Sequence, residues 1–391
     1  MTTNDLFAGG PPFKLQARLG LAKPGAPDLI RWCLLVILIG WVPLAVLTTV
    51  QSLVQQNTGL DSFLSDFGVH GRSLIAAALL IFADSLLVKR LGAAAGHFLD
   101  SGLVSTSDHG RFAAAAATTR RLRDSTLAEV AVVVIAYAIV GALIYYIPEL
   151  QLPAWMRAGD GAFGRFSPAG WWHALVSIPL LLMFFLGSLW RIFLWARFLG
   201  LMSRLDLKLV PVHPDRAAGL KFVGSSVRAF SFHGLTLGTV VAARMANAIV
   251  HEGQPLFAFK YTILGLVIFV IVLSGAPLLL FGTRLLAARR RGGLEYGLLA
   301  SKMGREFERK WLGRADAVDD EALKMQDFSA TTDLYSIVAN LDNLRFFPLD
   351  FKMLQVLVVA TLLPFVVVAF IALPLEQILD QSFSWLARLL S

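Results

Sequence analysis

Seven long apolar runs divide this chain of 391 residues and constrain its fold more than any other feature. A helix needs about 20 predominantly apolar residues to cross the hydrocarbon core of a bilayer. The runs span residues 30–50, 73–88, 127–147, 171–195, 229–250, 261–285 and 353–375. We therefore predict an all-α integral membrane protein with about seven transmembrane helices. The second run is short and the fifth is only moderately apolar, so these two depart most from a typical span.

The composition agrees with a membrane protein and excludes several kinds of site. Hydrophobic residues make up 56% of the chain and charged residues 16%, which is more apolar and less charged than ordinary soluble domains. Cys33 is the only cysteine, so a disulfide framework and a multi-thiol metal site are excluded. The histidines lack zinc-ligand spacing and no Gly-rich phosphate loop occurs, so we predict neither a metal nor another cofactor.

The positions of Lys and Arg predict the orientation, because cytoplasmic loops carry an excess of both. With the N-terminus inside and the C-terminus outside, nearly all of the 35 Lys and Arg lie on the cytoplasmic side. The basic residues elsewhere are five in outer segments and one within the membrane: Arg72, Arg157, Arg165, Lys260 and Arg388, and Arg244. Basic loops beside membrane ends indicate contact with the lipid bilayer and its anionic lipids, not with nucleic acid.

The predicted organisation has four parts. They are a cytoplasmic N-terminal segment (1–29), a six-helix membrane region (30–285) with cytoplasmic loops 89–126 and 196–228, a cytoplasmic helical segment (286–352), and a last transmembrane helix with an outer amphipathic tail (353–391). In the third part, apolar residues recur at helical spacing in two stretches, 294–311 and 334–344. We predict a cytoplasmic layer of two amphipathic helices that pack on each other or on a neighbouring subunit of a homo-oligomer.

Residues 213–220, His-Pro-Asp-Arg-Ala-Ala-Gly-Leu, form a distinctive motif in the second cytoplasmic loop. Proline fixes φ, Asp215 can cap the following helix and Gly219 permits a bend, so turn chemistry explains the motif. The alternative is a polar gate on the cytoplasmic side formed by His213, Asp215 and Arg216.

This motif, together with Glu295-Tyr296-Gly297 and the Phe-x-x-Lys-Trp pattern of residues 307–311, resembles a family of uncharacterised bacterial polytopic inner-membrane proteins. The resemblance runs from about residue 209 to 379. It implies a multi-pass protein of the bacterial inner membrane and implies no catalytic activity. Ala218 departs from the pattern, which has glycine at that position.

The fifth run carries polar side chains on one helical face, namely His233, Thr236, Arg244, Asn247 and, just beyond the run, His251. Ionisable residues inside a bilayer are costly unless they meet a partner or water, so this face should be wet or paired. Small residues at positions 234, 238, 242 and 246 follow another face, where a neighbouring helix can approach closely.

These residues, with Asp84 of the second run, suggest a transport path. We predict an ion channel or small-solute transporter with a polar path beside the fifth transmembrane helix. An Arg244 that lined an aqueous passage would favour anions. Equally open is a structural role in which Arg244 pairs with Asp84.

The alternative function is a membrane scaffold or interaction protein whose cytoplasmic helices bind a partner. An enzyme ranks third, because no convergent cluster of carboxylates and histidines is visible and no catalytic residue is predicted.

Overall fold

The computed structural model describes residues 5–12, 29–56, 58–147, 151–158, 165–312 and 327–372. Within these ranges the chain is helical, and its only β contacts are two isolated bridges, Val104 with Leu207 and Arg157 with Phe166. The predicted all-α fold is confirmed for this part of the protein. The predicted amphipathic tail beyond residue 372 lies outside the described residues.

The first half of the chain builds one side of a helical bundle. Its elements are α2 (Leu29–Gly40), α3 (Val42–Gln55), α4 (Gly59–Leu64), α5 (Phe67–His70), π-helical η1 (Gly71–Ala76), α6 (Ala77–Asp100), η2 (Thr106–Asp108), α7 (His109–Arg123), α8 (Thr126–Tyr146), η4 (Ala154–Met156), α9 (Pro168–Trp172), π-helical η5 (His173–Ser177) and α10 (Ile178–Met202). The second half comprises α11 (Lys221–Gly224), α12 (Ser226–Ala229), α13 (Ser231–Glu252), η6 (Leu256–Phe259), α14 (Lys260–Gly275), η7 (Ala276–Phe281), α15 (Gly282–Trp311), α17 (Asp327–Asp342) and α18 (Phe351–Ala372).

Among the described residues, five helical stretches are long and apolar enough to cross a membrane: Leu29–Gln55, Thr126–Tyr146, Pro168–Met202, Leu256–Trp311 and Phe351–Ala372. They coincide with five of the seven predicted spans. The other two predicted spans, 73–88 and 229–250, form η1 with α6, and α13. Both are long helices, but neither combines the hydropathy and the low number of charged residues that the other five have.

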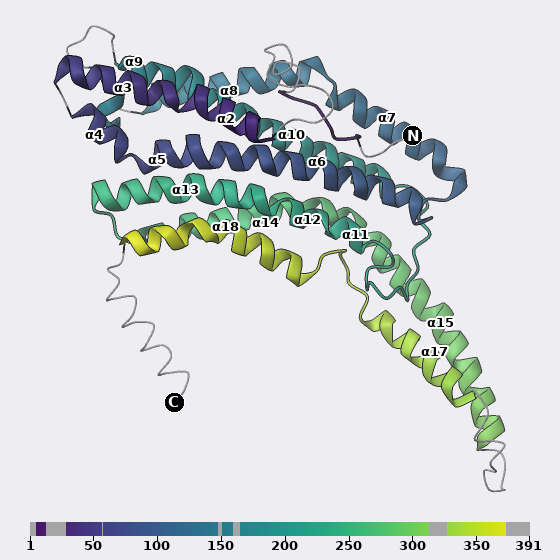
Figure 1. Ribbon diagram of the computed structural model, residues 1–391. Coiled ribbons are helices and arrows are strands. Elements are labelled where there is room, and N and C mark those ends of the chain that lie inside the picture. Colours follow the sequence, from purple (N-terminus) through teal and green to yellow (C-terminus); the bar gives the residue numbers. More distant parts are fainter. Residues whose placement is uncertain are drawn as a thin grey trace, which may run out of the picture.

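Helices α6 and α13 run through the middle of the bundle, with α2, α3 and α10 on one side and α14 and α18 on the other (Figure 1). The surrounding helices expose large apolar side chains outward, for example Val134 of α8 (60% exposed) and Val359 of α18 (64%). An apolar surface of this extent is typical of lipid or protein contact. A helix at the centre is surrounded by other helices, which explains why α13 can carry small and polar residues.

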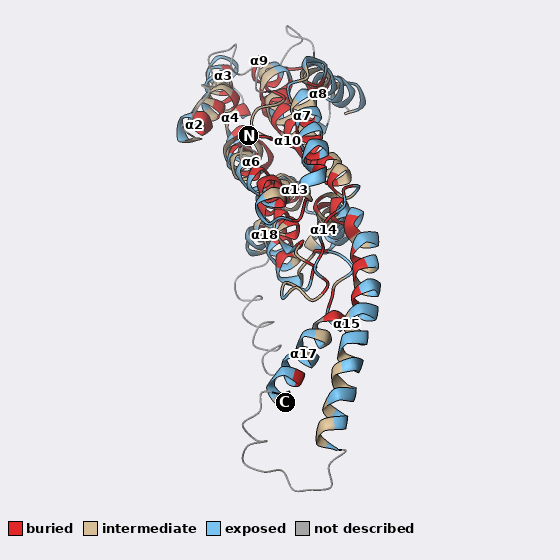
Figure 2. Cartoon of the chain, turned by 90° about the vertical axis from the view of Figure 1, so that its right-hand side faces the viewer, coloured by how far each residue is buried: buried red, intermediate tan, exposed pale blue. Residues whose placement is uncertain are grey.

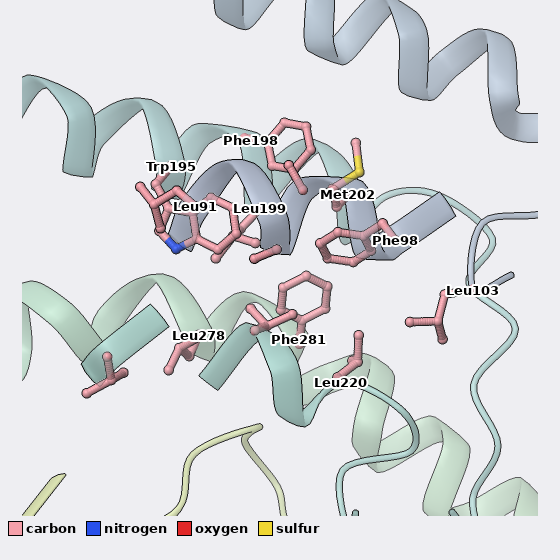
Figure 3. Packing of buried hydrophobic residues seen from close by; sticks show 14 of the residues in the cluster. Leu91, Phe98, Leu103, Trp195, Phe198, Leu199, Met202, Leu220, Leu278 and Phe281 are labelled. Carbon is pink, nitrogen blue, oxygen red and sulfur yellow. The ribbon is translucent and has the colours of Figure 1, made fainter. Parts of the chain in front are cut away.

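The largest hydrophobic core lies at the end of the bundle where α6, α7, α10 and η7 meet. Figure 3 shows Phe98 of α6 between Phe198 of α10 and Phe281 of η7, and each of these two rings lies 6.3 Å from Phe98 between centroids. Leu6 and Phe7 of the N-terminal segment belong to the same core and are 0% exposed. This end of the bundle is therefore fixed by aromatic packing.

Helices α15 and α17 pack along each other and project away from the bundle (Figure 1). Most of their surface is exposed (Figure 2). Gly292 of α15 lies against Pro211 and Leu341, where a Cβ would have no space. The two helices predicted between residues 286 and 352 thus pack on each other. Leu294 and Leu298 of the predicted apolar face remain 78% and 56% exposed.

Candidate functional site

Helix α13 contributes side chains to two buried polar clusters near its two ends. It contributes His233 to one cluster and Asn247 to the other. The two residues are about 21 Å apart along the helix, at 1.5 Å per residue. The Asp84 cluster consists of Asp84, Ser188, Arg191 and His233. The Asp66 cluster consists of Asp66, Arg72, Trp155, His173 and Asn247.

An ion pair between α6 and α10 forms the centre of the Asp84 cluster. The Arg191 guanidinium donates to one carboxylate oxygen of Asp84, and Ser188 Oγ donates to the other at 2.7 Å. Ser188 and Arg191 are three residues apart and therefore share a face of α10. Arg191 is 9% exposed at its side chain and Asp84 17%. A buried pair of this kind is retained only with additional hydrogen bonds, which Ser188 supplies here.

His233 extends the same cluster from α13. It is 4% exposed, and neither ring nitrogen has a hydrogen-bond partner of normal geometry. The charges of Asp84 and Arg191 lie close enough to act on the ring. Buried polar groups without partners are uncommon in folded proteins, because each costs about 1–3 kcal/mol. The Ala229 carbonyl of the same helix acts on the ring as a hydrogen-bond acceptor, so His233 lacks only a side-chain partner. A buried histidine of this kind beside an ion pair is a candidate for proton transfer.

Asp66 organises the second cluster. Its carboxylate caps α5 by accepting from the backbone N–H of Val69 at 3.0 Å. Asn247 Nδ2 of α13 donates to Oδ1 at 2.7 Å, and Trp155 Nε1 donates to Oδ2 at 2.9 Å. One carboxylate thus joins α5, α13 and the segment that contains η4.

Two further side chains of the Asp66 cluster come from π-helical turns. Arg72 lies in η1 and His173 begins η5. The charges of Asp66 and Arg72 both act on His173, whose ring lies 5.4 Å from that of Trp155. Arg72 Nε and His173 Nδ1 are buried without a hydrogen-bond partner. Single π-helical turns are frequent at functional sites, and two of them contribute a side chain to this cluster.

The pKa of Asp66 reflects these contacts. Burial alone would raise the pKa, but the hydrogen bonds from Asn247 and Trp155 and the charge of Arg72 outweigh burial. The pKa therefore lies below the ordinary value of 3.8, and the carboxylate is ionised at neutral pH.

Two histidines connect the Asp66 cluster to its surroundings. Trp41 Nε1 donates to His70 Nδ1 at 2.9 Å, so Nε2 of His70 carries the proton that it donates to the Phe63 carbonyl at 3.0 Å. His251 of α13 donates from Nε2 to the Ser65 carbonyl at 2.9 Å. The predicted site residues Asn247 and His251 therefore both contact the segment just before α5.

Two residues of the predicted path, Thr236 and Arg244, belong to neither cluster. Thr236 is buried, but its hydroxyl donates to the Phe232 carbonyl of its own helix at 2.8 Å. The Arg244 side chain is 60% exposed and pairs with Glu252 at 2.9 Å. The predicted pairing of Arg244 with Asp84 is wrong, because Arg191 occupies that position. On the predicted polar face of α13, the Arg244 side chain therefore lies at the surface, whereas Asn247, three residues later, reaches the Asp66 cluster.

The small-residue face of α13 contacts α18 closely. A Cβ at Gly234 or Gly238 would overlap Thr361 of α18, whose hydroxyl already donates to the Leu357 carbonyl. Farther along, Ala242 and Ala246 pack against Phe365 and Val368. This close approach orients the opposite face of α13 toward α6 and η1.

The His-Pro-Asp motif forms a turn held by one carboxylate. Asp215 accepts the backbone N–H groups of residues 217, 219 and 221 at 2.8, 3.1 and 3.1 Å, the last at the start of α11. His213 Nδ1 lies 2.9 Å from Asp215 Oδ1, and Arg216 is exposed with φ +56°. Ala218, which has φ +54°, is fully buried. These contacts account for the motif by turn chemistry.

Sequence reasoning found Asp84, His233, Asn247 and His251 but missed their partners. Arg72 falls in a predicted outer segment, and neither Arg191 nor Asp66 is among the predicted site residues. The spacing Ser188-x-x-Arg191 on an apolar helix was a readable signal for the first cluster. His173, inside the fourth apolar run, was a second signal.

Neither metal nor family supplies a function. In the described ranges, no group of three or more His, Cys, Asp or Glu side chains is placed to hold a metal ion. Comparison with protein-family models, curated proteins and solved structures finds no match. The function has to be argued from the two clusters.

Proposed function

We propose that the protein is a multi-pass membrane transport protein, an ion channel or small-solute transporter, whose polar path follows α13 between the Asp84 cluster and the Asp66 cluster. The observation that carries this proposal is His233, which is buried beside an ion pair in the centre of an apolar bundle and has, among the described residues, only the Ala229 carbonyl of its own helix as a hydrogen-bond acceptor. Intramembrane ionisable residues mark ion pathways and proton relays more often than lipid-facing surfaces. Protons are therefore the first ion to test.

The proposal includes seven crossings with the N-terminus inside and the C-terminus outside. Basic residues of the segments after α6 and α10, such as Arg120, Arg121 and Arg204, support it. If α6 and α13 did not cross, these segments would lie on the outer side, against the positive-inside tendency. The same basic segments support contact with anionic lipids in a bacterial inner membrane.

Reconstitution tests the transport proposal. Purified protein in liposomes that contain a pH-sensitive dye should dissipate an imposed proton gradient faster than protein-free vesicles. Asp84→Asn removes the charge at nearly constant shape and should lower the flux about tenfold, equivalent to about 1.4 kcal/mol. Glu252→Gln is the matched control, because its carboxylate pairs with Arg244 at the surface. Equal rates in Asp84→Asn and wild type would refute a path through this cluster.

The α15–α17 hairpin favours a second candidate function. It projects from the bundle and exposes Leu294 and Leu298, as a scaffold or an oligomer contact would. Replacing both leucines with serine should change the size of the purified particle if the hairpin joins subunits of a homo-oligomer. If particle size and flux both stay unchanged, the hairpin does not join subunits, and transport does not depend on Leu294 and Leu298.

A further inference from the structure

The N-terminal segment, residues 5–12, docks against the bundle beside α7 and α10 (Figure 1). Leu6 and Phe7 are 0% exposed. The Phe7 ring lies edge-on to Trp195 at 5.6 Å and to Phe198 at 6.0 Å, both on α10. An apolar anchor of two side chains therefore fixes the segment at the end of the bundle that also contains the Asp84 cluster.

Two arginines bind the backbone of the same segment. Arg123, the last residue of α7, donates to the carbonyls of Asp5 and Leu6 at 2.5 and 3.2 Å. Arg191 donates from its second terminal nitrogen to the Gly9 carbonyl at 3.1 Å. Arg191 is also the partner of Asp84. One guanidinium therefore joins the segment to the Asp84 cluster.

Helix α10 makes space for the segment at one glycine. Gly187 lies one helical turn before Arg191, and a Cβ there would overlap the Pro11 carbonyl oxygen. The nearest atoms that this Cβ would meet all belong to Pro11 and Pro12. A Cβ at 187 would therefore push first against the segment.

Resting on the proposed function, we propose that residues 5–12 are a plug that closes the polar path at the Asp84 cluster. While the plug is docked, the Arg191 guanidinium is shared between the Asp84 carboxylate and the Gly9 carbonyl, and Pro11 covers α10 at Gly187. When the plug leaves, a buried Arg191 N–H loses its acceptor and requires water or an ion in its place. Release of the plug thus hydrates the cluster, which is the step that opens a path.

Gly187→Ala tests the plug without removing any contact that the segment makes. Alanine also favours the helix, so α10 itself should not suffer. The control is Gly200→Ala on the same helix, where the nearest atom to a Cβ is 3.8 Å away. Hydrogen exchange of the amides of residues 5–10 measures docking, because Pro11 and Pro12 have no N–H, and proton flux in liposomes measures opening. In Gly187→Ala we expect both to rise about tenfold over wild type and over Gly200→Ala.

Phe7→Ala provides a second route to release, because it removes the aromatic anchor and leaves α10 unchanged. It should raise the same two measurements. Rapid exchange of residues 5–10 in the wild type, or unchanged exchange in Gly187→Ala, would overturn the docking itself. If wild type conducts protons, and the variants exchange faster but have the same flux as wild type, the plug would be refuted and the transport proposal would remain. Faster exchange in both variants with no flux in any protein would refute transport and the plug together.

Discussion

At the residue scale, the molecule is organised by charged groups that sit far apart in sequence. Asp84 meets Arg191 and Asp66 meets Asn247, so each carboxylate joins helices that no local pattern connects. The sequence indicates which residues are costly to bury, because Asp84, His233 and Asn247 interrupt apolar runs. It does not indicate which residues compensate them. The sequence suggests Arg244 as the partner of Asp84, whereas Arg191 is the partner in the structure.

Removing one member of the Asp84–Arg191 pair should destabilise the protein more than removing both. Asp84→Leu or Arg191→Met leaves one uncompensated buried charge, at a cost of about 3–5 kcal/mol. The double variant leaves none, so its loss should be smaller than either single loss. Thermal unfolding of the four proteins in detergent measures this coupling. Additive losses would contradict a direct interaction between the two residues.

The Asp66 cluster should make stability depend on pH in the acid range. The pKa of Asp66 in the folded protein lies below 3.8, so its stabilising contribution is complete above that value. The contribution is lost as the pH falls below 3.8 through the lowered folded pKa, because protonation then favours the unfolded chain. Asp66→Asn should lower stability by about 1.5–3 kcal/mol near pH 6 through the lost charged hydrogen bonds.

The difference in unfolding free energy between wild type and Asp66→Asn should shrink on acidification. Thermal unfolding measured from pH 6 to pH 3 would record this change. Asp61→Asn, an exposed position on α4, is the control for general charge effects. A difference that stays constant over this range would mean that the Asp66 carboxylate does not titrate with folding.

At the scale of elements, apolar length predicted the outer helices well and the central ones poorly. Spans such as 353–375 face outward and read as continuous apolar runs. Helix α13 is enclosed by α6, η1 and α18, so packing selects glycine and alanine over leucine. Its small residues recur every four positions, and this spacing predicts the contact face. The π-helical turns η1 and η5 were not readable, because their extra residue is accommodated by tertiary contacts.

Gly238→Ala should destabilise the α13–α18 contact. The new Cβ would overlap the Thr361 carbonyl, and separating two packed helices costs about 1–3 kcal/mol. Gly265→Ala on α14 is the matched control, since a Cβ there meets nothing within 4 Å. That control should be neutral or stabilising by up to about 1 kcal/mol, because alanine favours helix. Equal unfolding temperatures for the two variants would contradict the close approach.

At the scale of the whole molecule, the order of the helices carries information that hydropathy lacks. Helices α3 and α8 are joined through α6, and α10 and α14 are joined through α13. Helices α6 and α13 both run the length of the bundle, so each central helix returns the chain to the end from which the next outer helix starts (Figure 1). Five crossings alone would leave α6 and α13 on one side of the membrane, although both run the length of the bundle.

Cysteine labelling separates seven crossings from five. In a Cys33→Ser background, the protein has no native thiol, and Arg121→Cys and Gln254→Cys each place one at an exposed position. Seven crossings put residues 121 and 254 on opposite sides, because α8, α10 and α13 intervene. Five crossings, without α6 and α13, put both on the outer side, since only α8 and α10 intervene.

A membrane-impermeant maleimide should therefore label Gln254→Cys in intact spheroplasts and Arg121→Cys only in inverted vesicles. Arg290→Cys is the control, because it lies inside in both arrangements. Labelling of both test positions from the same side would exclude α6 and α13 as spans. It would also remove α13 from the bilayer, and with it the transmembrane path that the proposal places along this helix.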